Sequence, residues 1–358
     1  MIIGSQEMKK ILVVNLGGMG DNFLSLPALK ALRRLYPQSY IAVLTISRAR
    51  EVLSGVDFIN EIVTIDLDHR GSGVLQGLIR WKFFYGLLMN LRKENFDMAI
   101  NMRTLVSSWS AIKMSLIFLL VNAKYKVGRD TIGRGFFLNV KVPESYPGTK
   151  HDMEYDLDIV RALGASTEDA GLEFDISKED TEFADNLLRS RGIKPGDILI
   201  GISPGAPLPS RRWPLENFME VAKILSERGC KIIIMGNRDE SYIKDDLEKA
   251  GGRGLILIFG ETNIRQFAAL IKRCVIYLVN DTGAMHIAAS LGVNMVAMIG
   301  PGDIENYDSR KVSANASVFY KKTDCSPCEK RSCDSLKCLK AIKPQEVTDK
   351  CLEILRKI

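Results

Sequence analysis

Residues 10–36 read KILVVNLGGMGDNFLSLPALKALRRLY, and this stretch indicates the fold of the chain. Residues 10–16 form a short apolar run rich in β-branched side chains, which is typical of a buried strand. Glycines follow this run, and residues 22–36 then form an amphipathic segment of helical length. A strand that passes through a glycine turn into a helix is the first half of a βαβ unit. The stretch therefore predicts an α/β fold.

The alternation of strands and helices continues along the chain and starts again after a less regular stretch at 128–180. Strands separated by helices of ten or more residues predict parallel sheets. The two series indicate two Rossmann-like domains, with a ligand cleft between them at the carboxyl ends of the strands. The length of 358 residues agrees with two domains. After the first strand, we expect strands at 40–46, 61–66, 97–102, 197–204, 230–236, 254–260, 275–281 and 293–301.

The composition excludes several classes of protein. Apolar residues make up 46% of the chain and charged residues 26%, which is ordinary for a folded protein and excludes disorder, collagen and coiled coils. The net charge of +6 suits anionic small molecules or a membrane surface and does not call for nucleic acid. Residues 1–10 lack the apolar core of a secretory leader, and serines and a lysine interrupt the apolar region at 105–121. We expect a cytoplasmic protein, with peripheral contact to the inner face of the membrane as an option.

The glycine turn after the first strand ends in an acidic residue, Asp21. Gly18 and Gly20 match part of a dinucleotide-binding fingerprint, but Phe23 occupies the third glycine position, and no Walker lysine follows. The start of a helix attracts anions, whereas a carboxylate placed there repels a phosphate. The residues alone leave two interpretations of Asp21, a cap of the helix and a general base.

The loop at 203–214, SPGAPLPSRRWP, carries two adjacent basic residues, Arg211 and Arg212. Its glycine and prolines predict a rigid loop, and a helix follows it. Because arginine forks onto phosphate oxygens, the pair suits a phosphorylated ligand. The alternative is a solvated arginine pair.

The sequence NDTGAMH at 280–286 ends a strand and opens a helix. Thr282 and Gly283 would begin this helix, whose first N–H groups can bind a diphosphate. Asp281 could instead simply cap the helix. His286 has the equally plain interpretation of a helix histidine with satisfied hydrogen bonds.

Four cysteines occur within fourteen residues, Cys325, Cys328, Cys333 and Cys338. They are enough for a tetrahedral thiolate site that holds structural zinc or iron. Free thiols and two disulfides are the alternatives, and none of the three is catalytic because the run follows the last expected strand. The run lacks the interleaved basic and aromatic residues of a nucleic-acid-binding knuckle.

Four of these motifs, in this order, resemble glycosyltransferase family 9, the family of the ADP-heptose:lipopolysaccharide heptosyltransferases. They are the GGMGD start with its PALKALRRLYP helix, the SPGA…SRRWP loop, NDTGAMHIAASLG and the cysteine run, which resembles the tail of the heptosyltransferase II branch. The segments KYKVGRD and YDLDIVRALG extend the resemblance over nearly the whole chain.

The resemblance implies a GT-B architecture of two facing Rossmann-like domains. An N-terminal domain at 1–178 would bind the acceptor, and a C-terminal domain at 179–343, which contains the cysteine segment 325–338, would bind the nucleotide-sugar. A last helix at 344–358 would pack back on the N-terminal domain. The implied reaction moves a heptose from ADP-heptose to a lipopolysaccharide inner-core acceptor, with inversion and without a catalytic metal or other cofactor.

The resemblance also assigns roles to single residues. Asp21 matches the catalytic base, and Arg211 matches the residue that neutralises the leaving diphosphate, with Arg212 as the second choice. The diphosphate-binding loop would comprise Asp281, Thr282, Gly283 and Ala284. Weaker assignments to the nucleotide or sugar of the donor are Gly20, Ser203, Asp239, Glu240 and His286.

Acceptor recognition is assigned to the first domain, where the chain departs from the family pattern. Relatives often have a basic residue at the position of Ser107, and here Arg103 lies nearby instead. The helix expected at 74–94 places Arg80 and Lys82 among aromatic residues. It is either a core helix with a solvated basic edge or a surface for an anionic, lipid-linked saccharide acceptor. We favour partial exposure of these cations.

Three other functions compete with a heptosyltransferase. One is a transferase for another nucleotide-sugar or acceptor, and the second is a nucleotide-sugar epimerase of GT-B fold. The third, a dinucleotide-dependent oxidoreductase, is disfavoured by the broken glycine fingerprint. A scaffold without activity is disfavoured because Asp21, Arg211 and Asp281 are all present.

Overall fold

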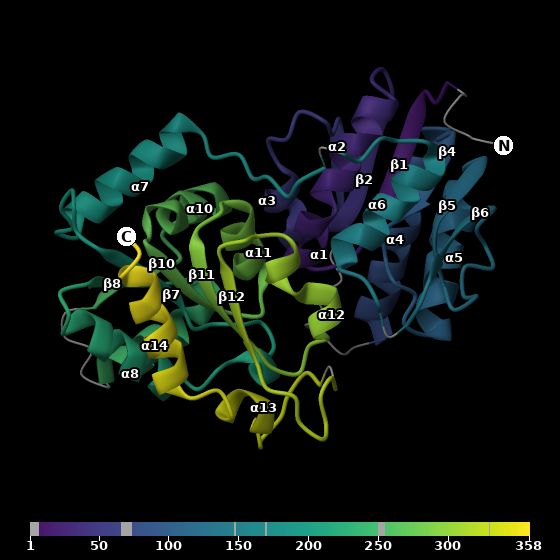
Figure 1. Ribbon diagram of the computed structural model, residues 1–358. Coiled ribbons are helices and arrows are strands. Elements are labelled where there is room, and N and C mark those ends of the chain that lie inside the picture. Colours follow the sequence, from purple (N-terminus) through teal and green to yellow (C-terminus); the bar gives the residue numbers. More distant parts are fainter. Residues whose placement is uncertain (1–6, 66–73, 147, 169, 250–254, 329) are drawn as a thin grey trace. The chain divides into compact units, whose positions relative to one another are not determined.

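The computed structural model describes residues 7–65, 74–146, 148–168, 170–249, 255–328 and 330–358. The chain divides into two compact units, Met1–Gly171 and Leu172–Ile358. The boundary between them lies a few residues before the one expected at 178–179. Each unit contains one six-stranded sheet (Figure 1).

The sheet of the N-terminal unit is parallel throughout, with the strand order β3-β2-β1-β4-β5-β6. In the register, Ile11 of β1 lies between Ile41 of β2 and Met98 of β4. The strands are β1 (Lys10–Asn15), β2 (Tyr40–Ile46), β3 (Glu61–Ile65), β4 (Met98–Asn101), β5 (Tyr125–Thr131) and β6 (Val140–Glu144).

The helices of this unit are α1 (Met19–Leu24), α2 (Leu26–Leu35), α3 (Arg50–Leu53), α4 (Val74–Lys93), α5 (Ser108–Val121) and α6 (Asp152–Leu163). The helix expected at 22–36 is therefore two helices. Pro27 lies in the first turn of the second one, where the N–H that it lacks would have no partner within the helix. In the three-dimensional arrangement α2 packs on α6, and α4 packs on α5.

The C-terminal unit repeats the same topology, with the strand order β12-β11-β10-β7-β8-β9. Its strands are β7 (Leu199–Ser203), β8 (Lys231–Gly236), β9 (Ile256–Phe259), β10 (Ile276–Asn280), β11 (Asn294–Ile299) and β12 (Ala316–Tyr320). Its helices are α7 (Lys178–Ser190), α8 (Leu215–Ser226), α9 (Ser241–Lys249), α10 (Ile264–Arg273), α11 (Gly283–Ser290), α12 (Ile304–Tyr307), α13 (Lys337–Lys340) and α14 (Pro344–Leu355). The 3₁₀ turns η3 (Pro209–Arg211) and η4 (Arg238–Glu240) follow β7 and β8.

The α/β prediction is confirmed, although the sequence reading missed β5, β6 and β12. These strands have charged or half-exposed residues where the others have continuous apolar runs, as in YKVGRDT and VKVPE. β6 and β12 lie at sheet edges, where burial on both faces is not required. Their composition therefore carries little of the signal by which buried parallel strands are recognised.

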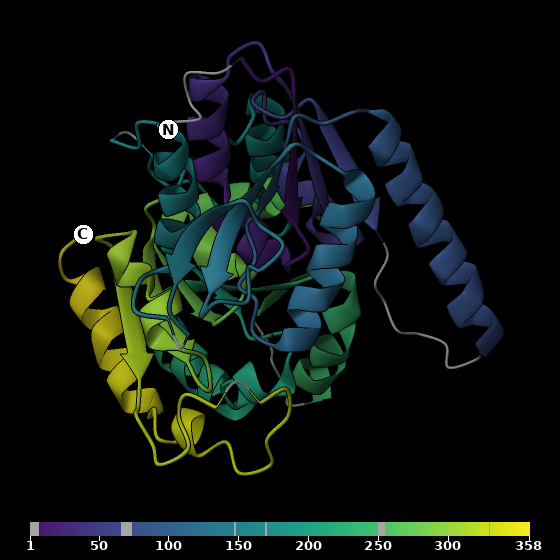
Figure 2. The ribbon, with the colours of Figure 1, turned by 90° about the vertical axis from the view of Figure 1, so that its right-hand side faces the viewer.

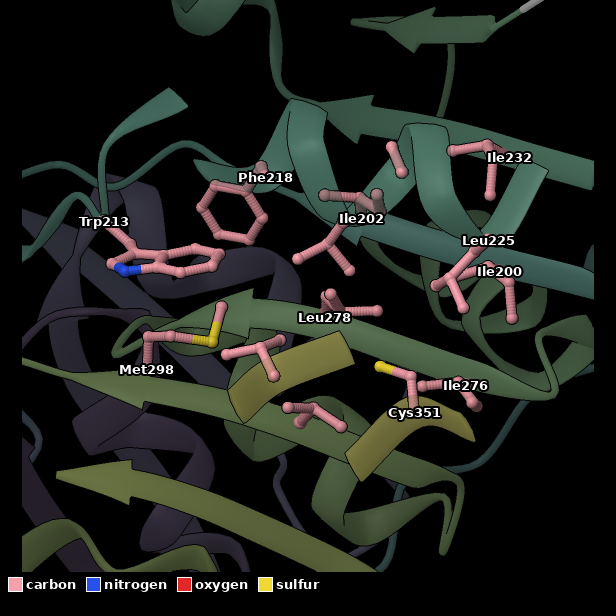
Figure 3. Packing of buried hydrophobic residues seen from close by; sticks show 14 of the residues in the cluster. Ile200, Ile202, Trp213, Phe218, Leu225, Ile232, Ile276, Leu278, Met298 and Cys351 are labelled. Carbon is pink, nitrogen blue, oxygen red and sulfur yellow. The ribbon is translucent and has the colours of Figure 1, made fainter. Parts of the chain in front are cut away.

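The last helix belongs to the core of the C-terminal unit. Val347 and Cys351 of α14 are fully buried in the apolar cluster that includes Ile276 and Leu278 of β10, and Figure 3 shows Cys351 among these strand residues. The packing of 344–358 on the N-terminal domain stays a prediction. The apolar face of the helix is used within its own unit, where α14 packs on α8 and β11.

Each sheet has one switch point, where successive strands are added on opposite sides of a central pair. It lies between β1 and β4 in the N-terminal unit and between β7 and β10 in the C-terminal unit. Ligands of open α/β sheets bind at the carboxyl ends of the strands at such points. Within the described residues, no helix is both long enough and apolar enough to cross a membrane.

Candidate active site

The turn after β1 is held by two buried asparagines. Asn15 accepts a hydrogen bond from the N–H of Gly17 at 3.1 Å, and Asn22 donates to the carbonyl oxygens of Gly17 and Gly18. A Cβ at Gly17 would lie only 2.5 Å from the Asp21 side chain. Glycine is therefore required there, because the backbone passes directly under the acidic side chain.

The Asp21 carboxylate uses each of its oxygens differently. Oδ2 accepts a hydrogen bond of 2.6 Å from the N–H of Gly18, the N-cap residue of α1. Oδ1 forms an ion pair of 2.7 Å with Nη1 of Arg103. The first contact is the capping role that the sequence left open, and the second brings a cation from the turn after β4 to the same group.

Arg103 lies in the turn that follows β4, across the switch point from Asp21. The side chain of Asn101 accepts from the N–H of Arg103 and donates to its carbonyl oxygen, which fixes the turn. The side chains of Arg103 and Asp21 are 29% and 19% exposed. The pair is thus held by the fold and is still open to solvent on one side.

A buried polar network lies beneath this turn. The hydroxyl of Ser25 contacts the Asp156 carboxylate at 2.5 Å, the carbonyl oxygen of Asp21 at 3.0 Å and the amide of Asn15 at 2.8 Å. Asp156 in turn contacts the guanidinium of Arg129 at 2.6 Å. A chain of hydrogen bonds therefore connects the backbone of Asp21 with a buried arginine on β5.

Arg129 is fully buried and faces three carboxylates. Besides Asp156, it pairs with Asp152 at 2.7 Å and Glu144 at 3.0 Å. Burial, together with the charge of Asp152, raises the pKa of Asp156 to about 7 against the pull of Arg129. Burial opposes a lower pKa at Asp152, but the charges of Arg129 and Arg103 together bring that pKa below its usual range. One cation among three buried acids favours a proton on Asp156.

In the C-terminal unit, Asn280 joins the two loops at the switch point. Its amide donates to the carbonyl oxygen of Pro204 at 2.8 Å, and its oxygen accepts from the N–H of Trp213 at 3.0 Å. Trp213 is itself buried against Phe218, as Figure 3 shows. The SPGA…RRWP loop and the start of the NDTG loop are thereby fixed to each other.

Arg211 and Asp281 meet across this switch point. Nη1 of Arg211 lies 3.1 Å from Oδ2 of Asp281, which is only 2% exposed, whereas the arginine is 21% exposed. The guanidinium also lies over the ring of Tyr307, 6.0 Å from its centroid. A Cβ at Gly302 would come within 2.6 Å of the Asp281 oxygen. The buried carboxylate therefore orients the cation, whose other edge reaches the surface.

Arg212 takes a different direction from Arg211. Its Nε donates to the carbonyl oxygen of Ala206 at 2.8 Å, and its guanidinium lies over the ring of Tyr242. Both contacts occur within the loop and the neighbouring helix α9. The two adjacent arginines are thus separated by the structure, and Arg211 is the one beside the NDTG loop.

Glu240 lies against the glycine of the SPGA loop. A Cβ at Gly205 would meet its carboxylate at 2.0 Å, and the same carboxylate accepts from the N–H of Asn237 at 3.0 Å. Burial raises the pKa of Glu240, while the Asn237 hydrogen bond and the charge of Arg212 oppose the rise. Ser203 is buried nearby, between Tyr277 and the carbonyl oxygen of Met235. Asp239 is exposed.

Thr282 is the N-cap of α11, with extended backbone, and Gly283 and Ala284 form the first turn of the helix. In the part of the chain that the structure describes, the Thr282 side chain does not cap the helix. The N–H groups of this first turn point away from the helix body toward the end where Asp281 and Arg211 lie. His286 is buried one turn later, with its ring 6.2 Å from that of Tyr307.

The remaining predicted residues lie elsewhere. Gly20 is the second residue of α1, and Lys82 is exposed on α4. Arg80 belongs to α4, but its side chain lies outside the described residues.

The four clustered cysteines do not form a metal centre in the structure. All are free thiols, with Cys325 exposed and Cys338 buried. Among the described residues, no three His, Cys, Asp or Glu side chains are grouped as metal ligands. The residues as placed do not fit zinc or iron, so the expectation of a structural metal is not supported.

Three of the contacts that reasoning from the sequence missed involve the loops at the two switch points. They are the Asn280 bridge, the Tyr307 ring against Arg211 and the Arg103 pair with Asp21. A signal existed for the first, since Asn280 directly follows a buried strand at a predicted cleft. Tyr307 lies in a four-residue helix with no pattern of its own, and only the folded chain brings it to the arginine.

Known proteins resemble this chain along most of its length. It is 26% identical over 307 residues to lipopolysaccharide heptosyltransferase 2 of Escherichia coli K12, covering 82% of this chain and 83% of that protein. The structure of E. coli ADP-heptose lps heptosyltransferase II has a TM-score of 0.74 at 22% identity, covering 97% of this chain and 99% of the other. A glycosyltransferase family 9 structure from Veillonella parvula has a TM-score of 0.75 at 23% identity, covering 100% and 99%.

These similarities in structure show the fold alone, which is that of the GT-B heptosyltransferases. The family itself is shown by the sequence. The model of glycosyltransferase family 9 (heptosyltransferase) matches residues 85–339, which is well over half of the chain and includes Arg103, Arg211 and the whole NDTG loop. The chain therefore belongs to glycosyltransferase family 9, the heptosyltransferase family.

Proposed function

We propose that this enzyme transfers a heptose from ADP-heptose to the inner core of a lipopolysaccharide, with inversion at the anomeric carbon and without a catalytic metal. The N-terminal unit would bind the acceptor, and the C-terminal unit would bind the donor. The observation that carries the proposal is that Asp21 and Arg211 each lie at the switch point of their own sheet, one as an accessible carboxylate and the other as an oriented cation. The curated relatives, whose names describe lipopolysaccharide heptosyltransferases, support the choice of substrates.

Asp21 is proposed as the general base. Its carboxylate accepts the proton of the attacking acceptor hydroxyl while that oxygen bonds to the anomeric carbon. Gly18 and Arg103 hold the two carboxylate oxygens in a fixed direction. The carboxylate is the form of Asp21 that is able to accept a proton.

The departing group is the ADP diphosphate. As the bond from the anomeric carbon to the diphosphate oxygen breaks, its electron pair remains on the phosphate, and Arg211 and the first turn of α11 stabilise the growing negative charge. Asp281 keeps Arg211 in place from its buried side. Attack from the face opposite to the leaving group, in one displacement, gives inversion.

The cation and the helix N-terminus supply the positive potential at the diphosphate, and we therefore propose that catalysis needs neither a metal nor another cofactor. Weaker donor contacts are proposed for Gly20, Ser203, Asp239, Glu240, His286 and Arg212.

On the acceptor side we propose Arg80, Lys82 and Arg103, with Arg103 both orienting Asp21 and facing the anionic acceptor. The site of action would be the cytoplasmic face of the inner membrane, where a lipid-linked acceptor is presented.

The test is direct transfer. The purified enzyme is incubated with ADP-heptose and a lipopolysaccharide acceptor that lacks the heptose, and ADP release and product mass are followed with and without EDTA. We expect ADP release that depends on the acceptor and survives EDTA, and a product of inverted configuration by NMR. Turnover with UDP-sugars but not ADP-heptose would contradict the choice of donor, and loss of activity in EDTA would contradict metal independence.

A further inference from the structure

Helix α5 of the N-terminal unit carries large apolar residues on its solvent-facing side as well as on its core-facing side. Its sequence is SWSAIKMSLIFLLV. The core-facing side is complete, since Ala111, Met114, Ile117, Phe118 and Val121 are buried. A surface helix normally presents mainly polar residues on its other side, whereas here Ser108 and Lys113 share that side with large apolar residues.

The solvent-facing side of α5 carries a row of large apolar residues. Trp109, Ile112 and Leu119 are 63%, 50% and 62% exposed, and Val106, just before the helix, is 48% exposed. Positions 109, 112 and 119 are separated by three and seven residues, so they lie along one face. Polar side chains at these positions would lower the stability of the fold only a little, because the side chains are largely exposed and contribute little to the core.

The loop between β5 and β6 extends this row. Phe136 is 61% exposed, and its ring contacts Phe137, which packs edge-on against Phe118 of α5. We call the set Val106, Trp109, Ile112, Leu119 and Phe136 the α5 surface. Several exposed residues on neighbouring elements exceed the scattered apolar residues of an ordinary monomer surface.

Helix α4 packs beside α5, as Figure 2 shows, and adds to the apolar region. Phe83 is 69% exposed and Tyr85 is 46% exposed. Phe83 and Lys82 line an open surface groove of about 510 Å³ along this helix. Apolar side chains thus project from two adjacent helices of the same unit.

The charge around these side chains is positive. Between positions 82 and 124, six basic residues stand against two acidic ones. Both acids are engaged, Glu94 with the ammonium of Lys10 and Asp97 with the N–H groups that begin β1. The ammonium of Lys113 lies over the Trp109 ring, 5.4 Å from its centroid. Tryptophan beside lysine is the pairing found where proteins meet the headgroup region of a bilayer.

We propose that the α5 surface is the site at which this enzyme docks on an anionic phospholipid bilayer. The apolar side chains enter the boundary between headgroups and acyl chains, while the surrounding lysines and arginines bind the anionic headgroups. A bilayer fits better than a second copy of this chain, because a second copy would bring the same positive charges against each other.

The position of the surface suits the reaction. α5 begins five residues after Arg103, which pairs with Asp21. A bilayer held along α5 would present its headgroups near that end of the sheet. In this respect the inference rests on the proposed function, since only a lipid-linked acceptor gives the docking a catalytic purpose.

The experiment measures docking without any sugar substrate, so that it can fail or succeed independently of the transferase proposal. Full-length protein is sedimented with vesicles of equimolar phosphatidylglycerol and phosphatidylcholine and with vesicles of phosphatidylcholine alone. The variants are Trp109→Ser/Ile112→Ser for the apolar row and Lys113→Glu/Lys124→Glu for the charge. The matched controls are Ile198→Ser and Lys178→Glu, which change exposed residues of the C-terminal unit.

We expect the wild type and both controls to sediment with the anionic vesicles. The apolar double variant should bind at least about tenfold more weakly, and the charge variant should bind about fivefold more weakly for each lysine reversed. In proteins that carry Trp81→Phe, the fluorescence of Trp109 should shift to the blue on the anionic vesicles. Trp109→Phe should keep the binding and lose the shift.

Several outcomes would overturn the proposal. Equal vesicle binding by the wild type and the Trp109→Ser/Ile112→Ser variant would show that the α5 surface does not bind the bilayer. A wild type that binds neither kind of vesicle would show the same. A wild-type dimer that the same variant dissociates, without vesicle binding, would assign the surface to a second copy. If docking occurs but no heptose is transferred, the proposed function fails and the inference stands.

Discussion

Asp21 carries a capping bond and an ion pair on the same carboxylate, so the two roles must be separated by substitution. Asp21→Asn keeps an oxygen for the N–H of Gly18 but cannot accept a proton. We expect kcat to fall about a hundredfold or more, with the Kd for ADP and the midpoint of thermal unfolding nearly unchanged. Steady-state kinetics, calorimetry and thermal melts measure the three quantities. Wild-type kcat in this variant would leave Asp21 with the capping role alone.

The two adjacent arginines offer a matched pair of variants. Arg211 lies beside the start of α11, whereas Arg212 is directed to Ala206 and Tyr242. Arg211→Ala should weaken ADP binding about tenfold or more, because a charge-assisted contact to phosphate is lost. Arg212→Ala should weaken it less, and calorimetric titration with ADP compares the two. The reverse order of affinities would exchange their roles.

At the scale of secondary-structure elements, β5, β6 and α6 are held together by Arg129 and its three carboxylates. The proton on Asp156 gives this assembly a pH dependence. An unfolded chain releases that proton near pH 4, whereas the folded chain keeps it to about pH 7. The protonated carboxyl therefore contributes stability that is complete below about pH 4 and is lost as the pH rises through 7. Asp152 acts in the opposite direction, but only as the pH falls below the usual carboxyl range.

Asp156→Asn should flatten this dependence. In the wild type the Ser25 hydroxyl donates to Oδ2 of Asp156 and Arg129 donates to Oδ1. Asparagine keeps an oxygen for Arg129, can turn its amide to the Ser25 oxygen and carries no titratable proton. As the pH rises from about 5 to about 8, Asp156 loses its proton near pH 7, and we expect the melting temperature of the wild type to fall. The melting temperature of the variant should fall less over the same range. Asp158→Asn, on the outer side of the same helix, is the control and should keep the wild-type slope. Parallel slopes in all three proteins would contradict a proton on Asp156.

At the scale of the whole molecule, the chain consists of two units with the same strand order, and α14 is part of the second core. Ligand binding stabilises the folded form of the unit that binds it. We expect ADP to slow amide hydrogen exchange in α14 together with α8, on which it packs. Hydrogen exchange with mass spectrometry measures both helices in one experiment. Slower exchange in α8 with unchanged exchange in α14 would contradict a shared core.

Local pattern was enough to predict the alternation of strands and helices, the doubling of the Rossmann-like unit and the loops that carry Asp21, Arg211 and Asp281. Those features follow from side-chain periodicity and from glycine and proline, which act over a few residues. Local pattern did not predict the strands β5, β6 and β12 or the contacts of Arg103, Tyr307 and Arg129. Each depends on groups far apart in sequence, such as Asp21 with Arg103 or Ser25 with Asp156. Such partners, and the side of a mainly apolar helix such as α5 that stays exposed, become defined only when the sheets order their strands and bury one face of each helix.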